Sequence, residues 1–195
     1  MYNKLIGICN SDLKIAYDKI HEALNTLPRY TYRGNGEFSG EIPKGGGVYI
    51  IFEKGVKYGG YDRITRVGKA EKSLLARLQQ HFVKEDKDHS IFRKHVGRAL
   101  LNKKGLPLDD WNKKGVDVPD IEKKVSEYLK DNATFCVIPL ADKNEICILE
   151  KTLIEVLAAF NRSYLVVNGK AIQSDNWLGN HSANQKIKSN GLWNV

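Results

Sequence analysis

The sequence predicts an α+β fold, because two kinds of hydrophobic pattern occur along its 195 residues. Three short segments are dense in β-branched and aromatic residues, as strands are. Several longer segments place apolar residues three or four positions apart, as amphipathic helices do. A chain of this length is too short for two comfortable domains, so we expect a single domain with one well-buried core.

Residues 1–40 are predicted to form a helical N-terminal extension. Ser11 and Asp12 can cap a helix that runs to about Leu27, and Pro28 ends it. The stretch from Gly34 to Gly47 is rich in glycine and polar residues, and we expect a loop there.

The three strands are predicted at residues 47–52, 61–68 and 134–139. Gly59 and Gly60 lie between the first two, which favours an antiparallel hairpin. Helices are predicted at residues 71–83, 91–102, 120–131 and 144–158, and residues 103–120 have the composition of a loop.

The helix over residues 91–102 is expected to turn a basic face outward. No acidic residue interrupts it, and its cations are natural candidates for nucleic-acid contacts. These residues are Arg93, Lys94 and Arg98, followed by Lys103 and Lys104. The helix belongs to a basic helical insertion at about residues 84–131 within a core of residues 41–165. The tail, residues 166–195, is expected to pack on the core because it carries Trp177 and Trp193.

The net charge of +8 is unevenly distributed. Basic segments lie on both sides of a net-negative segment, residues 131–160, which suits a phosphate-rich partner with a cation-binding carboxylate at the centre. No apolar run approaches the ~20 residues that span a bilayer, and the N-terminus has no secretory pattern. With three cysteines in no paired spacing, we expect a cytoplasmic protein without a membrane partner.

A series of ordered residues resembles the GIY-YIG endonuclease superfamily. Gly47-Val48-Tyr49 is similar to the first half of its signature, and Arg66-Val67-Gly68-Lys69 occupies the place of the second half. The series continues with Leu74, Arg77 and His81, then Leu149-Glu150-x-x-Leu153-Ile154, then Phe160-Asn161. The resemblance implies a small antiparallel three-stranded sheet flanked by helices, and an endonuclease that uses one divalent ion, Mg²⁺ or Mn²⁺, in each active site.

The resemblance also implies roles for the matched residues. Tyr49 would handle the attacking water, Arg77 would contact the scissile phosphate, and Glu150 would hold the metal. His81 and Lys69 are expected to assist catalysis, as matched positions beside these three. Asn161 is a further matched position, and we expect it to contact nucleic acid.

The chemistry of these residue types agrees with the implied roles. Arg77 and His81 are four positions apart, so they share a helix face, and a guanidinium can bind a phosphate through two parallel hydrogen bonds. A solvated surface arginine is the simpler alternative. Glu150 follows Leu149 in the apolar stripe, and a partly buried carboxylate requires a compensating cation or donor. Its alternative is a surface ion pair with a neighbouring lysine, and Glu155 is the second metal candidate.

The second tyrosine of the signature is replaced by Arg66. On a regular strand residues 64 and 66 point one way and residue 61 the other, so Tyr61 could reach the site only through a bulge. We therefore expect Arg66 to face the site as an additional catalytic cation. A phenol ordinarily titrates near pH ~10, so Tyr49 would need such cations or a metal to act as a base.

Two functions from different classes follow. The first is a metal-dependent endonuclease acting on double-stranded DNA, compatible with restriction or genome defence. The second is a catalytically silent nucleic-acid-binding module, which Arg66 favours. RNA is the weaker substrate prediction, because no aromatic-rich binding motif is present. Cutting both strands with one site per chain would need a homodimer or two encounters.

Overall fold

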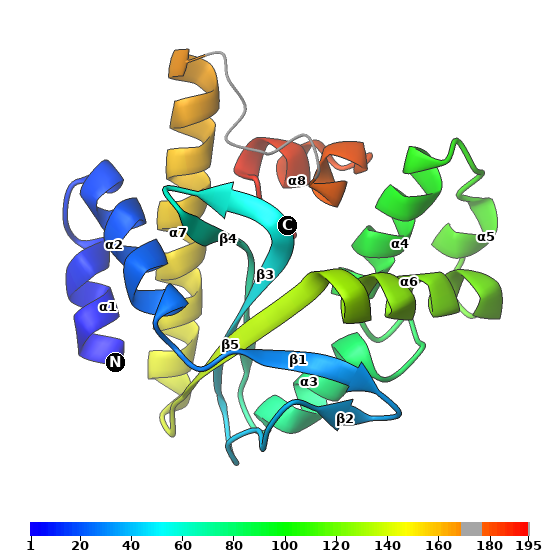
Figure 1. The fold of residues 1–195 in the computed structure, drawn as a ribbon, viewed down its shortest axis with the longest axis horizontal. Helices are drawn as coiled ribbons and strands as arrows, with labels where there is room; N and C mark the ends of the chain where they lie inside the picture. Colours follow the sequence, from blue (N-terminus) through cyan, green and yellow to red (C-terminus); the bar gives the residue numbers. More distant parts are fainter. Residues whose placement is uncertain (169–176, 195) are drawn as a thin grey trace.

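The computed structural model describes residues 1–168 and 177–194, so residues 169–176 and 195 of the predicted tail lie outside the described residues. A five-stranded antiparallel sheet lies between two layers of helices (Figure 1). Its strand order is β2-β1-β5-β3-β4. The strands are β1 (Tyr30–Gly34), β2 (Glu37–Phe38), β3 (Gly47–Tyr58), β4 (Tyr61–Ala70) and β5 (Ala133–Pro139).

One face of the sheet is covered by the two N-terminal helices and the long helix that follows β5, and the other by helices from the middle of the chain. The first layer contains α1 (Tyr2–Cys9), α2 (Leu13–Asn25) and α7 (Lys143–Asn168). The second contains α3 (Leu74–Phe82), α4 (Ile91–Lys103), α5 (Asp109–Asn112) and α6 (Pro119–Asn132). The C-terminal segment follows with η1 (Leu178–His181) and α8 (Gln185–Asn190).

The predicted α+β class is confirmed, but the predicted three-stranded sheet is wrong. The three expected strands are β3, β4 and β5, and the chain before them adds β1 and β2. β2 lies inside the stretch expected to be a loop. Asn35 and Gly36 both have positive φ, 53° and 82°, as a tight hairpin turn requires. Asn-Gly between two strand-like runs is a strong hairpin pattern, so the sequence did contain the information.

The β3–β4 hairpin carries a bulge that changes which side chains share a face. Ile51 pairs with Arg66 but Phe52 pairs with Ile64, so Thr65 is the extra residue. Ile64 therefore packs in the core on the α7 side, opposite Arg66, and the expectation that both face one way is wrong. Tyr61 lies at the far end of the hairpin, paired with Tyr58, and does not line the site.

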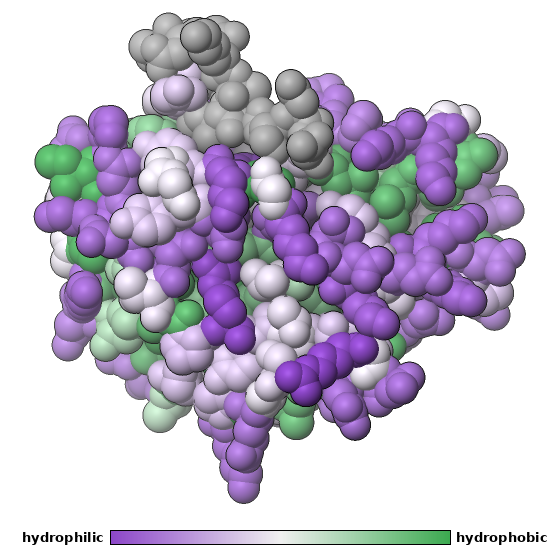
Figure 2. Space-filling model, in the orientation of Figure 1, coloured by the Kyte–Doolittle hydropathy of each residue, from purple (hydrophilic) through white to green (hydrophobic). Residues whose placement is uncertain are grey.

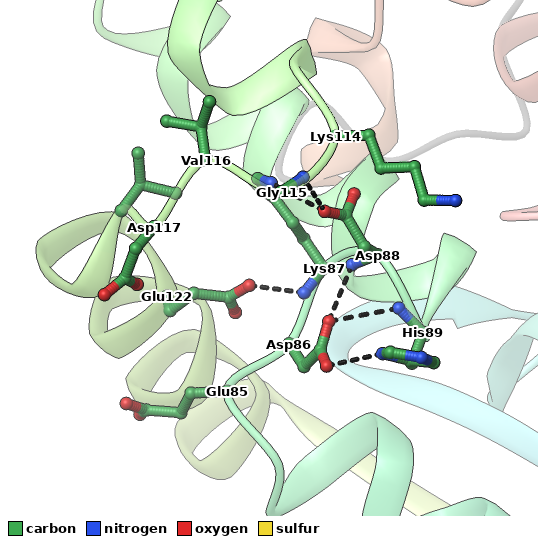
Figure 3. A pocket seen from close by; sticks show the side chains of 11 residues that line it. Glu85, Asp86, Lys87, Asp88, His89, Lys114, Gly115, Val116, Asp117 and Glu122 are labelled. Carbon is green, nitrogen blue, oxygen red and sulfur yellow. Dashed lines mark hydrogen bonds and ion pairs between the residues drawn. The ribbon is translucent and has the colours of Figure 1, made fainter.

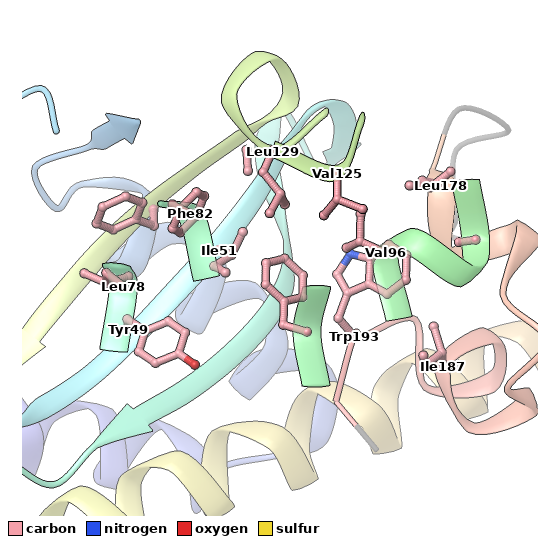
Figure 4. Close-up of a cluster of buried hydrophobic side chains, with 14 of the residues drawn as sticks. Tyr49, Ile51, Leu78, Phe82, Val96, Val125, Leu129, Leu178, Ile187 and Trp193 are labelled. Atoms are coloured by element: carbon pink, nitrogen blue, oxygen red, sulfur yellow. The ribbon is translucent and has the colours of Figure 1, made fainter. Parts of the chain in front are cut away.

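Two hydrophobic clusters hold the layers together. On the α7 side, Val48, Ile50 and Phe52 of β3 pack against the apolar stripe of α7. On the other side, Tyr49 and Ile51 pack with α3, α4 and α6. Figure 4 shows that Trp193 of the C-terminal segment belongs to this second cluster.

The indole groups of the C-terminal segment are anchored on one buried carboxylate. Trp177 and Trp193 both donate their Nε1–H to Glu53 Oε1, at 2.9 and 2.5 Å. Trp193 N also donates to Thr65 O at 2.7 Å, and the side chain of Asn194 bonds the N–H and the carbonyl of Val67. These contacts cover the otherwise open edge of β4.

The molecular surface is mainly hydrophilic on the face shown in Figure 2. Large exposed hydrophobic side chains are scattered over separate elements, for example Ile15 of α2, Leu75 of α3 and Ile148 of α7. Within the described ranges, no helix is long and apolar enough to cross a membrane.

Candidate active site

A cleft of about 480 Å³ lies beside β4, where the two helical layers separate. Five of the six predicted catalytic residues line it, and the sixth, His81, contacts the cleft residue Tyr49 from behind. The five are Tyr49, Arg66, Lys69, Arg77 and Glu150. They come from β3, β4, α3 and α7, so folding alone brings them together.

The position of Tyr49 depends on the glycine opposite it. Tyr49 pairs with Gly68 across the β3–β4 ladder, and a Cβ at position 68 would overlap the Tyr49 ring. Arg66 lies on the same sheet face, two residues along β4. Lys69 points toward the other layer, where its Nζ lies 3.8 Å from the Glu150 carboxylate. The cleft therefore receives side chains from both faces of the sheet at the β4 edge.

The phenol of Tyr49 is held by a short chain of hydrogen bonds. Its oxygen lies 2.6 Å from His81 Nε2, and His81 Nδ1 lies 2.7 Å from Ser90 Oγ. Ser90 is the N-cap of α4 and accepts from Arg93 N. Burial, with Arg66, Arg77 and Arg93 nearby, lowers the pKa of His81 well below its usual value. The imidazole is therefore neutral at neutral pH, and it orients the phenol.

Two guanidinium groups enter the cleft from different elements. Arg66 is buried, donates from Nη1 to Trp193 O at 3.1 Å and lies over the Phe92 ring. Its Nε has no hydrogen-bond partner in the described structure. Arg77 of α3 donates to Gln80 Oε1 at 2.8 Å. Both guanidinium groups line the cleft, where they can donate hydrogen bonds to an anionic ligand.

The carboxylate of Glu150 is half-buried at the opposite wall, with 21% of its side chain exposed. Burial raises the pKa of this carboxyl, while Lys69, Arg66 and Arg77 oppose the shift. Glu71 also lines the cleft, and its carboxylate lies 3.5 Å from Lys69 Nζ. A hydrogen bond to Cys147 Sγ and the charge of Glu150 raise the pKa of Lys69, so this lysine stays charged.

This donor set fits a divalent ion that keeps most of its water. Mg²⁺ is commonly bound by one or two carboxylates together with waters and substrate phosphates. Glu150 can supply one such carboxylate and Glu71 a second. No group of three or more His, Cys, Asp or Glu in the described part of the chain could form a closed metal cage. An open site that the substrate completes is what the residues allow.

A family model of the GIY-YIG domain matches residues 9–195. The chain belongs to the GIY-YIG family. No curated protein and no solved structure matches it significantly. GIY-YIG proteins are typically endonucleases that act on nucleic acid and use divalent metal ions, so membership supports nuclease activity in general terms. The family match also agrees with the motif series that begins at Gly47.

A second pocket of the GIY-YIG fold, of about 400 Å³, contains more acidic residues but is not the better candidate (Figure 3). Asp88 accepts from Gly115 N at 2.8 Å and pairs with two lysines. Asp86 pairs with His89, and Glu122 pairs with Arg93. Asp86, Asp88 and Glu122 therefore already have protein partners, whereas Glu150 has Lys69 alone at ion-pair distance within the described residues.

The basic outer face predicted for residues 91–102 is wrong for Arg93. Arg93 is fully buried and forms a two-point contact with Glu122 of α6, at 3.0 and 2.6 Å. Lys94 pairs with Asp88, and Arg98 donates to Asn112. The reason is that α5 and α6 pack against this face of α4 with Asn112 and Glu122, and the segment before α4 supplies Asp88.

Among the other predicted nucleic-acid contacts, Lys103 and Lys104 are exposed at the end of α4. Asn161 is buried instead, because it accepts from Tyr17 Oη at 2.8 Å and donates to Asn190 O. These hydrogen bonds link α7 to α2 and α8, so a nucleic-acid contact through Asn161 is not supported. Glu155, the second metal candidate, is exposed and pairs with Lys151, outside the cleft.

Sequence reasoning missed three contributors to this site. Glu71 could have been predicted, because it lies only two residues after the second half of the motif. Ser90 could be found as a helix N-cap, but its contact with His81 could not. The hydrogen bond that Arg66 donates to Trp193 O joins residues 127 positions apart, and no local sequence pattern predicts it.

Proposed function

We propose that this GIY-YIG protein is a metal-dependent endonuclease that hydrolyses phosphodiester bonds of double-stranded DNA. The observation that supports it best is the composition of the cleft. An oriented phenol, two guanidinium groups and a half-buried carboxylate surround one space at the β4 edge. Hydrolysis of a phosphodiester needs an oriented water and cations around phosphorus, and these groups can supply both.

Each side chain has a role that follows from its contacts. The Arg77 fork would bind the scissile phosphate, and the Arg66 guanidinium, which also lines the cleft, would contact a second phosphate oxygen. The Tyr49 oxygen, fixed by His81, would hydrogen-bond the attacking water. Glu150, with Glu71 beside it, would hold Mg²⁺ or Mn²⁺, and a bound ion supplies electrostatic stabilisation of the charge that develops on the phosphoryl oxygens.

In the proposed reaction, water attacks phosphorus and forms a new P–O bond as the P–O bond to the leaving oxygen breaks. The Tyr49 oxygen, held by His81, would accept a hydrogen bond that orients the attacking water. The proton of that water would pass to solvent, and the leaving oxygen would take a proton from solvent. Because the imidazolium form of His81 is disfavoured, His81 is a positioning residue and not a lasting proton acceptor. Arg66 and Arg77 balance the additional negative charge at phosphorus.

Duplex DNA is the proposed substrate because the cleft offers no stacking surface for unpaired bases. Tyr49 is the one aromatic residue among those that line the described cleft, and it is fully buried. Recognition of single-stranded RNA or DNA ordinarily uses exposed aromatic platforms. With one proposed catalytic cleft in the described part of each chain, a double-strand break would take two protomers or two successive encounters.

A silent nucleic-acid-binding module is the second candidate, and one contact favours it. Lys69 Nζ lies 3.8 Å from the Glu150 carboxylate, the group proposed to hold the metal. If this ion pair persists when DNA is bound, Lys69 would neutralise the Glu150 carboxylate in place of a metal ion. Arg66, in place of a tyrosine hydroxyl, would then serve as a phosphate contact.

Incubation with supercoiled plasmid and Mg²⁺ or Mn²⁺ tests the two candidates. We expect nicked and then linear DNA with either ion, and intact plasmid with EDTA. Nicked plasmid that accumulates before linear plasmid indicates two encounters, and direct linearisation indicates a dimer. Tight binding without cleavage under any of these ions would establish the silent module instead.

A further inference from the structure

A groove of about 690 Å³ continues from the cleft toward the C-terminal segment. It shares Arg66 and Glu150 with the cleft, so the two spaces meet at the proposed metal-binding carboxylate. One wall is α7, with Ile154 and Arg162. The other wall is α8 and the residues after it, and Lys186 lies on this wall.

The groove is positively charged beyond the shared carboxylate. Arg162 and Lys186 are exposed in it, and neither forms an ion pair with any carboxylate that the structure describes. Glu150 is the one acidic residue among those lining the described groove. Arg162 Nη1 donates to Asn190 Oδ1 at 2.7 Å, which holds the guanidinium at the α8 wall. Two such cations in one groove suit a row of phosphates.

The wall that carries Lys186 is a fixed part of the fold. Asn161 donates to Asn190 O, and the following Gly191 has φ 62°, in the region that favours glycine. A Cβ at Gly191 would lie 2.6 Å from Asn161 Nδ2, so the close approach of α8 to α7 depends on this glycine. A preformed groove binds a ligand without an ordering cost for its walls.

The dimensions match a nucleic-acid strand. Arg162 is twelve residues beyond Glu150 on α7, which corresponds to ~18 Å along the helix axis at ~1.5 Å per residue. A strand of B-DNA advances ~3.4 Å per nucleotide along its axis. The groove can therefore follow about five nucleotides from the cleft.

We propose that this groove binds the phosphate backbone of the DNA on one side of the scissile bond, through Arg162 and Lys186. The inference rests on the proposed function of the cleft, which it extends to a substrate-binding surface. Contacts of this type are independent of base sequence. They would position the strand so that the scissile phosphate reaches Arg77.

The test is the salt dependence of binding to a fluorescent 30-base-pair duplex, measured by anisotropy in Ca²⁺ for the full chain. Each lost phosphate contact lowers the log–log slope by about 0.9. We expect Arg162→Gln/Lys186→Gln to lower it by about 1.8, and to weaken Kd on the order of 30-fold at ~0.15 M salt. Lys186→Gln alone removes no described protein contact, and should lower the slope by about 0.9.

A charge-matched control is Lys4→Gln/Lys19→Gln on α1 and α2, where both lysines are exposed. We expect its slope and its plasmid cleavage to equal those of the unmodified chain. A slope that is unchanged in the Lys186→Gln and double variants overturns the groove proposal, even where the plasmid is cut. Absence of plasmid cleavage by the unmodified chain overturns the proposed endonuclease instead, and the slope comparison still decides whether the groove binds DNA.

Discussion

Replacement of Tyr49 by Phe removes one oxygen atom from a residue that lines the cleft and leaves the aromatic ring in place. The ring is fully buried against Gly68, so no new space opens around it. The lost atom is the hydrogen-bond partner of His81 Nε2 at 2.6 Å. His81 is itself fully buried, and no other described side chain is hydrogen-bonded to its Nε2.

The expected loss of stability follows from that unsatisfied nitrogen. A buried polar atom without a partner costs about 1–3 kcal/mol. For a domain of this size, each kcal/mol lowers Tm by roughly 2–4 °C. Tyr49→Phe should therefore lower Tm by roughly 2–12 °C and leave the protein folded at 25 °C. If Tyr49 also handles the attacking water, the cleavage rate should fall by about 10²–10⁴-fold.

The assay is single-turnover plasmid cleavage at saturating enzyme, with duplex binding measured in Ca²⁺ and Tm by thermal denaturation. We expect the rate to fall while Kd changes less than about threefold, because a buried hydroxyl contributes little to ground-state binding. A variant with a lower Tm but full activity would show that Tyr49 is a structural partner of His81 alone. That result would refute the proposed role of the phenol.

Three further predictions concern Arg77, the carboxylates of α7 and the buried His21. Arg77→Lys keeps the positive charge but loses the planar guanidinium, so the rate of single-turnover cleavage should fall about 10²–10³-fold. Equal losses in cleavage rate and in binding affinity would show that Arg77 only binds the substrate. Glu150→Ala should abolish cleavage while Glu155→Ala remains active, and the reverse pattern would move the metal site one turn along α7. Burial lowers the pKa of His21 to about 4. Below pH ~6.5 the unfolded chain therefore binds a proton at His21 that the folded protein does not bind. As the pH falls from about 6.5 to 4, this difference should lower the free energy of unfolding by ~1.4 kcal/mol per pH unit. In urea titrations the stability difference between the wild type and His21→Gln should shrink over this range, and a constant difference would contradict the neutral His21.

Much of the strand and helix pattern could be predicted because it is local. The hairpin, the third strand and the helices that carry Arg77 and Glu150 follow from spacing within segments of about ten residues. Asn35-Gly36 could also have predicted the β1–β2 hairpin, but the glycine-rich composition of this segment suggested a loop. The bulge at Thr65 could not be predicted from the sequence, because it depends on the register in which β3 and β4 pair.

The sequence alone determined the family, through an ordered motif series whose residues meet in one cleft. Tertiary structure decided which charges remain available for a ligand. Arg93 is paired with Glu122, whereas Arg66 lines the cleft and has no carboxylate at ion-pair distance among the described residues. The charge of a side chain is a property of the residue, but its burial and its partner depend on elements far away in the chain. That is why the predicted basic helix proved largely internal, and why the groove at Arg162 and Lys186 became visible in the folded protein.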